Sequence, residues 1–341
     1  MMTELEPRLV HAPELYGSAW LNGGPVSVRD LEGAVLLLDF WDYSCISCRR
    51  TLPYVKSGAE SYRASGLVAV GVHTPEFAFA ADEDRVSSAL RTLGVEYPVV
   101  LDNAAVIWGA YANRYWPTRY LIDRHRFIRF VQHGEGGYQA FERAIQVLLR
   151  DAGVHGELPS LMEPLRDEDV PGALCHRPTG EIHVGYLRGA LGNVEGYVPE
   201  ARWNYEDPGF YLPGRFYAVG IWWNGRECFR SGNQPGTPVA LVLPYEAKEV
   251  HAVMGSADGR VLMVTVEQDG APLPEAHAGA DVRRSASGAT VVEVQEPRLY
   301  RLVRNPVFGT HHVRLTIQDA GCEVYAFSFV TSVIVQSFSE N

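Results

Sequence analysis

Two cysteines three residues apart, Cys45 and Cys48, are the residues of this sequence best suited to do chemistry. They follow an apolar run of strand length, Val35 to Trp41, so the pair lies where a strand passes into a helix. On the first turn of a helix this spacing brings both sulfur atoms within bonding distance, and the helix N-terminus stabilises a thiolate on the first cysteine. We therefore expect a redox-active dithiol in which Cys45 is the nucleophile and Cys48 the resolving thiol.

A Cys-x-x-Cys pair can also be half of a zinc site, which needs a second pair of ligands. The other three cysteines, Cys175, Cys228 and Cys322, stand singly. Cys175 is followed by His176, the nearest thing to a second ligand pair, but no companion motif accompanies it. The sequence thus favours redox chemistry, and we expect no metal and no other cofactor.

A carboxylate precedes the cysteines. Asp39 lies six residues before Cys45 in a strand whose other members are nearly all apolar, so we expect its side chain to be buried. Burial raises the pKa of a carboxyl group and lets it exchange protons with a thiol during disulfide exchange. The alternative is an aspartate at a strand end that only hydrogen-bonds the backbone.

Two prolines have positions that matter for the cysteine pair. Pro53 falls five residues after Cys48, inside the expected helix, where it removes one backbone hydrogen bond and kinks the helix. Pro117 lies between Trp116 and Thr118, directly before a strand-like segment, and is a candidate for a cis peptide bond. We expect Pro117 to lie against the pair, where a residue without an amide hydrogen leaves room for a substrate strand.

The order of Asp39, the Cys45/Cys48 pair, Pro53 and Pro117 along the chain resembles the thioredoxin superfamily. The resemblance implies a thioredoxin-like α/β fold, with Cys45, Cys48, Asp39 and Pro117 as the catalytic set. The residues expected in the vicinity of the pair are Trp41, Ser44, Ile46, Ser47, Trp116 and Thr118.

More narrowly, five segments look like the soluble part of DipZ-type proteins, namely 41–48, 51–54, 71–77, 113–117 and 120–123. That subfamily carries a TlpA-like thioredoxin domain followed by a β-rich, carbohydrate-binding-module-like domain. Three segments of the second half also resemble it, 281–282, 298–303 and 325–327. DipZ-type proteins usually begin with a membrane-embedded electron-transfer domain, which this sequence does not contain.

Segment order predicts two domains. The first half alternates strand-like and helix-like segments, as in a central sheet covered by helices, and we expect this α/β domain to occupy residues 1–150. Glycines and prolines break the periodicity over 151–175, which we interpret as a linker. Residues 176–341 carry short strand-like runs without intervening helices, typical of an all-β sandwich of jelly-roll-like type.

The expected elements can be given by residue range. In the first half we expect strands at 35–40, 66–72, 97–101, 119–123 and 128–132, and helices at 48–65, 82–93 and 138–150. In the second half we expect strands at 216–222, 239–242, 248–254, 261–266, 290–294, 312–316 and 323–329.

Aromatic residues in the second half raise the possibility of glycan binding, because exposed rings stack on sugars. Trp203, Trp222 and Trp223 are the candidates for such a surface. Strand alternation puts Trp222 and Trp223 on opposite faces, so we expect one of them in the core. The alternative is that all of these rings pack inside the protein, and we expect no detectable sugar binding.

Composition narrows the choice of partners. The 341 residues carry a net charge of −11, which argues against nucleic acid or an anionic membrane as the main partner. No stretch approaches the roughly 18 apolar residues of a membrane span, and the opening residues lack a signal-peptide pattern. We expect a cytoplasmic protein, with export as the open alternative. We expect it to act on protein disulfides and to exchange electrons with an unidentified donor or acceptor.

The leading hypothesis is a thiol-disulfide oxidoreductase that cycles Cys45 and Cys48 through mixed disulfides with protein substrates. The alternative is a glycan- or protein-binding module with the thioredoxin-like domain as a redox-sensitive support. A peroxidase is a lesser alternative because Thr74-Pro75 resembles peroxiredoxin-like insertions, although the dithiol spacing fits disulfide exchange better.

Overall fold

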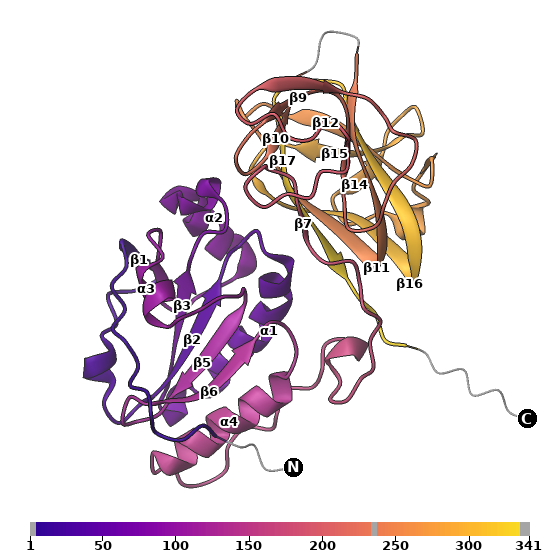
Figure 1. The fold of residues 1–341 in the computed structure, drawn as a ribbon. Coiled ribbons are helices and arrows are strands. Elements are labelled where there is room, and N and C mark those ends of the chain that lie inside the picture. The colour runs from indigo at the N-terminus through magenta and orange to yellow at the C-terminus, as the bar shows by residue number, and fades with distance from the viewer. Residues whose placement is uncertain (1–4, 233–236, 335–341) are drawn as a thin grey trace, which may run out of the picture. The chain divides into compact units, whose positions relative to one another are not determined.

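The structure, a computed structural model, describes residues 5–232 and 237–334 (Figure 1). The chain divides into two compact units, residues 1–172 and 173–341. Each unit contains its own buried apolar core. The first unit is an α/β sheet structure and the second is built from strands, as the sequence predicts.

The first unit is organised around a six-stranded sheet. In sheet order its strands are β1 (Ala19–Leu21), β4 (Val99–Leu101), β3 (Leu67–His73), β2 (Val35–Trp41), β5 (Thr118–Ile122) and β6 (Ile128–His133). Strand β2 is parallel to β3 and antiparallel to β5, and β3 is parallel to β4. Every residue of β2 is buried, which explains its nearly continuous apolar run.

Four α-helices accompany this sheet: α1 (Ile46–Ser61), α2 (Glu83–Leu93), α3 (Val106–Ala110) and α4 (Tyr138–Asp151). Apolar residues of α1, α2 and α4 share one buried cluster with Leu37 and Trp41 of β2. The other cluster combines α3 with Leu36 and Phe40, so alternate residues of β2 point to opposite faces of the sheet. By the same alternation, Asp39 points to the face that carries α1.

The predicted helices and strands of this unit are present with small changes in their ends. Helix α1 begins directly after Cys45 and contains Pro53. Short 3-10 turns, which the periodicity does not indicate, lie at η1 (Val28–Leu31), η2 (Arg63–Ser65), η3 (Ala78–Ala81) and η4 (Asp167–Asp169). The stretch from 74 to 112 holds α2, β4 and α3.

The end of the first unit differs from the expected boundary at residue 150, because the following segment packs back onto the helices. Gln146 of α4 donates to the carbonyl of Pro159 at 2.8 Å. The Arg166 guanidinium donates to the carbonyl of Arg50 in α1, also at 2.8 Å. Most of the stretch that we expected to be a linker is therefore part of the first unit, which extends to Gly172.

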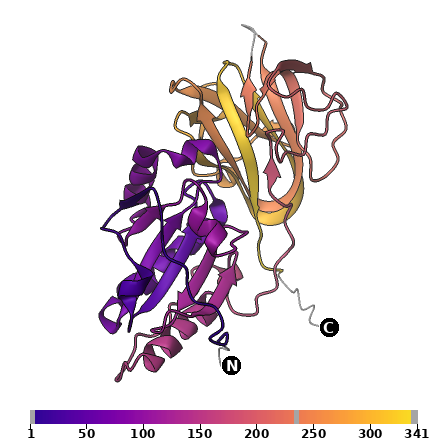
Figure 2. The ribbon, with the colours of Figure 1, turned by 60° about the vertical axis from the view of Figure 1, so that its left-hand side comes forward.

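The second unit contains an eleven-stranded sheet of sandwich-like form (Figure 2). The strands are β7 (Ile182–His183), β8 (Arg202–Tyr205), β9 (Tyr217–Asn224), β10 (Phe229–Ser231), β11 (Val239–Ser256), β12 (Leu262–Gln268), β13 (Ala271–Pro272), β14 (Val282–Arg284), β15 (Thr290–Val294), β16 (Arg298–Ile317) and β17 (Cys322–Val330). Each ladder between these strands is antiparallel. A 3-10 turn, η5 (Glu275–His277), precedes β14.

Two of the expected strands, 239–242 and 248–254, are parts of the single strand β11. The pairing of β11 with β16 shifts register between Ala247 and Glu249 and again between Val250 and His251. Such irregularities bend a strand without ending it. One long strand therefore pairs with β16 along most of its length, with β9 near its start and with β17 near its end.

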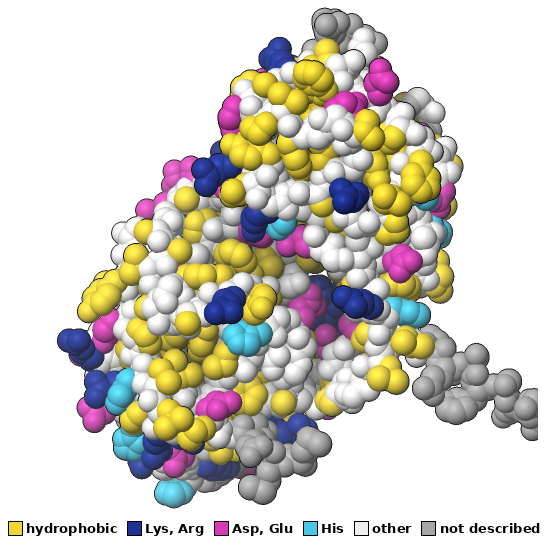
Figure 3. All heavy atoms as spheres, in the orientation of Figure 1, with side chains coloured by type: hydrophobic (Ala, Val, Ile, Leu, Met, Phe, Trp, Pro, Cys, Tyr) yellow, Lys and Arg dark blue, Asp and Glu magenta, His cyan; other side chains and the backbone are white. Residues whose placement is uncertain are grey.

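No described helix is both long and apolar enough to cross a membrane. On the face shown in Figure 3, the basic side chains of the described residues are scattered among acidic, apolar and neutral ones. This distribution gives no large basic area on that face, in keeping with the net charge of −11.

Candidate active site

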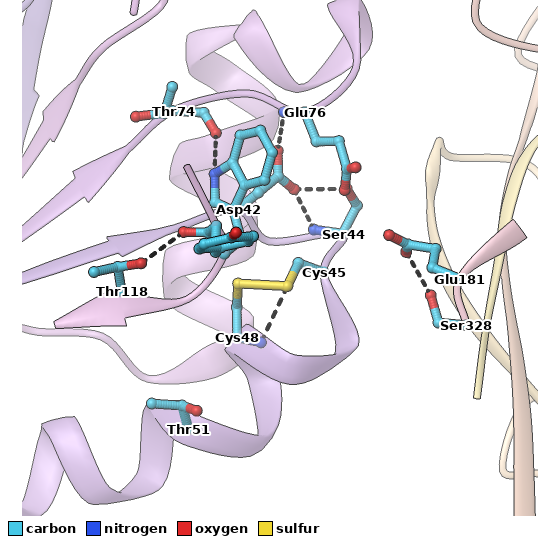
Figure 4. Close-up of a disulfide and its surroundings, with 12 residues drawn as sticks. Asp42, Ser44, Cys45, Cys48, Thr51, Thr74, Glu76, Thr118, Glu181 and Ser328 are labelled. Carbon is cyan, nitrogen blue, oxygen red and sulfur yellow. Dashed lines mark hydrogen bonds between the residues drawn. A yellow bond between two sulfur atoms is a disulfide. The ribbon is translucent and has the colours of Figure 1, made fainter. Parts of the chain in front are cut away.

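The cysteine pair lies where β2 leads into α1 (Figure 4). The sulfur atoms of Cys45 and Cys48 are bonded to each other, and the Cα atoms are 5.3 Å apart. Cys45 is partly exposed, whereas Cys48 is only 2% exposed. A substrate can therefore reach the sulfur of Cys45 more easily, which agrees with the predicted order of nucleophile and resolving thiol.

Helix α1 is built to favour a thiolate on Cys45. Cys45 is the N-cap residue, with extended backbone angles, and its Sγ accepts a hydrogen bond from the amide of Cys48 at 3.1 Å. The positive end of the helix dipole and this amide both stabilise negative charge on the sulfur. Of the two residues between the cysteines, Ile46 is buried and Ser47 is partly exposed.

A buried aspartate that the sequence analysis missed holds the loop before the pair. Asp42 Oδ1 accepts hydrogen bonds from both the amide and the hydroxyl of Ser44, each at 2.6 Å. Its Oδ2 accepts one from the amide of Glu76 at 2.9 Å (Figure 4). An Asp two residues before a Ser at the end of a strand is a pattern for such a turn, and could have identified Asp42.

The Pro117 loop is fixed by hydrogen bonds on both sides. The peptide bond between Trp116 and Pro117 is cis, as predicted. The Trp116 indole donates to the carbonyl of Thr74 at 3.0 Å, and the Thr118 hydroxyl donates to the carbonyl of Tyr115 at 2.8 Å. Thr118 and Pro117 are buried, and Trp116 is partly exposed.

Asp39 is 2% exposed, which confirms the predicted burial. Burial raises its pKa to about 7, and the positive charge of Arg119 opposes that rise. Asp39 Oδ1 has no hydrogen-bond partner among the described residues, so this oxygen does not cap the backbone. The side chain is therefore a carboxyl group that can accept or release a proton near neutral pH.

Other buried polar residues near the ends of these strands were not predicted. His73, the last residue of β3, is fully buried, and burial lowers its pKa. Its ring stacks on that of Tyr43, with 5.7 Å between the centroids. Asp102 accepts a hydrogen bond from the Thr74 hydroxyl at 3.1 Å. Both positions follow apolar runs in the sequence, where a polar residue ends a buried strand.

The second unit places the three candidate tryptophans differently. Trp222 has no exposed surface, and its indole donates to the carbonyl of Val219 at 3.0 Å. Trp222 is therefore excluded as a candidate for a binding surface, because this ring is part of the apolar core. The expectation that one of Trp222 and Trp223 lies in the core is confirmed. Trp203 on β8 is 44% exposed, and Trp223 is partly buried on the opposite face of β9 from Trp222.

Comparisons with known families match both units. Residues 11–131 match the AhpC/TSA family, and residues 179–329 match the family described as the thioredoxin like C-terminal domain. Over 267 residues the chain is 35% identical to Protein DipZ of Mycobacterium tuberculosis, in a match that covers 76% of this chain. The same match covers 37% of DipZ, so the chain corresponds to well under half of that relative.

The first unit alone has smaller relatives. Over 140 residues the chain is 27% identical to the thiol-disulfide oxidoreductase YkuV of Bacillus subtilis, covering 41% of this chain and 94% of YkuV. Among solved structures, a thioredoxin-like protein in the oxidized form is 29% identical, with a TM-score of 0.39. That match covers 41% of this chain and 95% of the solved one.

Proposed function

Because the chain matches DipZ over 76% of its residues, and its two units match the AhpC/TSA family and the thioredoxin like C-terminal domain, we propose that it is a thiol-disulfide oxidoreductase. The observation that carries the proposal is the Cys45–Cys48 disulfide at the N-terminus of α1, on the sheet face to which Asp39 points. A relative that the first unit matches over nearly its whole length, YkuV, is named for the same activity.

The reduced protein would act through two successive exchanges. The Cys45 thiolate attacks one sulfur of a substrate disulfide, forms a mixed disulfide and releases the other substrate sulfur as a thiolate. The Cys48 thiolate then attacks the Cys45 sulfur, which breaks the mixed disulfide and releases the second substrate thiolate. The substrate gains two electrons and two protons, and the Cys45/Cys48 pair becomes a disulfide.

Asp39 would serve the second exchange as a proton acceptor. Cys48 lies in the same buried cluster as Leu37 and Trp41, the residues two places before and after Asp39 on its face of β2. A thiol in such surroundings needs a base to become a thiolate, because burial disfavours the charged form. With its pKa at about 7, Asp39 can take that proton and return it at neutral pH.

The partners follow from this cycle. Substrates are proteins that carry an accessible disulfide, and a second dithiol or disulfide partner must restore the starting state of the pair. The reduction potential of the Cys45/Cys48 pair decides the direction of electron flow. A value of about −270 mV would make the protein a reductant, and a value of about −120 mV would make it an oxidant.

Reduction of insulin by the full-length protein with excess thiol tests the proposed activity. We expect turnover by the parent protein and by Cys175→Ser, which removes a cysteine outside the pair. Cys45→Ser should abolish the rate above the thiol background. Equal rates for the parent and Cys45→Ser would contradict the proposal.

A second candidate function, binding of a glycan or a partner protein, rests on Trp203. This ring is 44% exposed on β8, a strand at the edge of the second unit's sheet. Retardation on a glycan affinity gel that is lost in Trp203→Ala would support glycan binding. Equal migration of both proteins would remove Trp203 from any such role.

A further inference from the structure

A buried cation lies beside the carboxyl group of the proposed active site. In the antiparallel pair of β2 and β5, Asp39 is directly opposite Arg119. Side chains at directly paired positions lie on the same face of a sheet with adjacent Cβ atoms. Asp39 is 2% exposed and Arg119 is 1% exposed, so solvent screens little of their interaction.

Among the described residues, no carboxylate forms an ion pair with the guanidinium of Arg119. Its guanidinium lies 5.0 Å from the ring centre of Tyr138 and 4.8 Å from that of Phe141. Its Nη2 donates to the carbonyl of Gly136 at 2.9 Å. None of the ion pairs among the described residues includes Arg119, and its Nε has no hydrogen-bond partner. The carboxyl groups that interact with it at longer range are Asp39 and Glu135.

On the other side of Asp39, strand β3 contributes no charge. The paired residue there is Gly71. A Cβ at Gly71 would lie 3.0 Å from Trp41 Nε1 and 3.2 Å from the ring of Tyr97. The two aromatic residues therefore occupy the space that a side chain at this position would fill. Asp39 is thus paired with Gly71 on β3 and with Arg119 on β5, and of these two residues Arg119 carries the charge.

We propose that Arg119 is a positioning residue for the disulfide exchange, because it holds Asp39 in the carboxylate form that accepts the proton of Cys48. This inference rests on the proposed function. Burial alone would keep Asp39 protonated over a wider range of pH, and a protonated Asp39 cannot act as a base. The cation on the opposite strand offsets part of that penalty.

The other titratable groups around Asp39 do not replace this cation. Burial raises the pKa of Tyr97 well above its usual value, and burial also raises the pKa of Tyr138 on α4, so both phenols stay neutral. Burial lowers the pKa of His73 at the end of β3, which keeps its imidazole neutral at pH 7. From α1, Cys48 lies in the buried cluster on this face, and Tyr54 lines a small cavity together with Arg119. Burial raises the pKa of Tyr54 to about 12, so its phenol also stays neutral. Glu142 of α4 lines the same cavity, where its carboxylate accepts hydrogen bonds from the Tyr62 hydroxyl and the Met162 amide.

Asp42 follows β2 and carries a carboxylate, but Ser44 and Glu76 bind it by three hydrogen bonds. Glu135 also interacts with Arg119, but it forms an ion pair of 2.7 Å with Arg50. The proton affinity of Asp39 should therefore respond mainly to the charge at position 119.

The test is the pH dependence of insulin reduction by the full-length protein. We expect the rate of the parent to rise with pH through a midpoint near the pKa of Asp39, about 7. In Arg119→Gln and in Arg119→Met, which both remove the positive charge, the midpoint should move to higher pH by about 1 unit or more. Arg119→Lys keeps the charge and should restore a midpoint close to that of the parent.

Two controls separate this effect from a structural one. Arg91→Met removes a charge from α2 and should leave the midpoint where it is in the parent. In an Asp39→Asn background, from which the midpoint near pH 7 should be absent, Arg119→Gln should not change the pH profile of the remaining rate. The proposal would be overturned by a midpoint that is unchanged in both Arg119→Gln and Arg119→Met, or by one that moves as far in Arg119→Lys as in those two variants. It would also be overturned if Arg119→Gln changed the pH profile in the Asp39→Asn background.

Titration of the Asp39 carboxyl carbon by NMR gives the same answer without turnover. The titration midpoint of Asp39 should be higher in Arg119→Gln than in the parent and close to the parent value in Arg119→Lys. A higher midpoint together with no insulin reduction by the parent would retain the effect of Arg119 on Asp39 and reject the proposed activity. Equal midpoints in the parent and Arg119→Gln would reject the role of Arg119 even if the protein reduces insulin.

Discussion

Replacing Asp39 by Asn should make the first unit more stable at neutral and alkaline pH. The pKa of Asp39 is raised from 3.8 to about 7, because burial disfavours the carboxylate. The folded state therefore prefers the protonated form. Below pH 3.8 Asp39 is protonated in both the folded and the unfolded state and does not destabilise the fold. As pH rises above 3.8, ionisation of Asp39 lowers the stability of the folded state, and the loss is complete above about pH 7.

The size of the effect follows from the two pKa values. A difference of one pKa unit corresponds to 1.36 kcal/mol, so the rise of Asp39 from 3.8 to about 7 corresponds to about 4 kcal/mol. The stability of Asp39→Asn relative to the parent should increase by this amount between the acid and alkaline limits. Such a change is a large part of the roughly 5 to 15 kcal/mol that stabilise most domains.

Urea unfolding of the oxidised protein at a series of pH values measures this difference. The helical circular dichroism signal follows the first unit, since α1 to α4 all belong to it. A difference between the variant and the parent that stays constant within about 1 kcal/mol from pH 3 to pH 8 would refute the reasoning.

Asp123 provides a contrast of opposite sign in the same unit. Burial raises the pKa of Asp123, but hydrogen bonds from Arg8, Arg129 and backbone amides lower it by more, so the pKa is lowered overall. The folded state therefore prefers this carboxylate. Its contribution is present above pH 3.8 and is lost as pH falls through the lowered value. The advantage of the parent over Asp123→Asn should accordingly shrink toward acid pH.

Three further predictions concern the site directly. Cys48→Ser should accumulate mixed disulfides with substrate proteins on Cys45, visible by non-reducing electrophoresis and mass spectrometry; adducts on Cys48 in Cys45→Ser would reverse the roles. Asp39→Asn should slow insulin reduction and remove the rate midpoint near pH 7, and an unchanged pH profile would make Asp39 a purely structural residue. Asp42→Ala leaves three donors without their acceptor, the two of Ser44 buried and the Glu76 amide partly buried. The Ser44 and Glu76 amides should therefore exchange hydrogen at least about 10-fold faster, and unchanged exchange would show that the loop holds without Asp42.

The chemistry of the pair could be predicted because it depends on neighbours in the sequence. The spacing of Cys45 and Cys48, the strand before them and the helix after them are all local, and so is the cis bond before Pro117. Burial of Asp39 followed from the apolar run around it.

Other parts of the site depend on pairings between distant segments. Arg119 is far from Asp39 in sequence, and only the register of β2 against β5 brings them opposite each other. The alternation of β9 predicts that one of Trp222 and Trp223 is buried, but the packing of the whole sheet decides that it is Trp222.

The end of the first unit shows the same limit. The glycines and prolines of residues 151–175 are typical of a linker. Amino-acid composition alone does not reveal that Arg166 hydrogen-bonds to α1 or that Pro159 contacts α4. Likewise, the two short apolar runs within β11 have the spacing of separate strands. They form one strand because β16 continues to pair across the irregular region between them.

Equilibration of the full-length protein in redox buffers, followed by alkylation and mass spectrometry, tests the central claim most directly. If the pair is a reversible redox centre, Cys45 and Cys48 should lose and regain reactivity together at one midpoint potential, as a two-electron couple requires. The isolated thiols of Cys175, Cys228 and Cys322 should show no such joint transition. A Cys45/Cys48 pair that stays in one state across the whole series, or whose members change separately, would contradict the account.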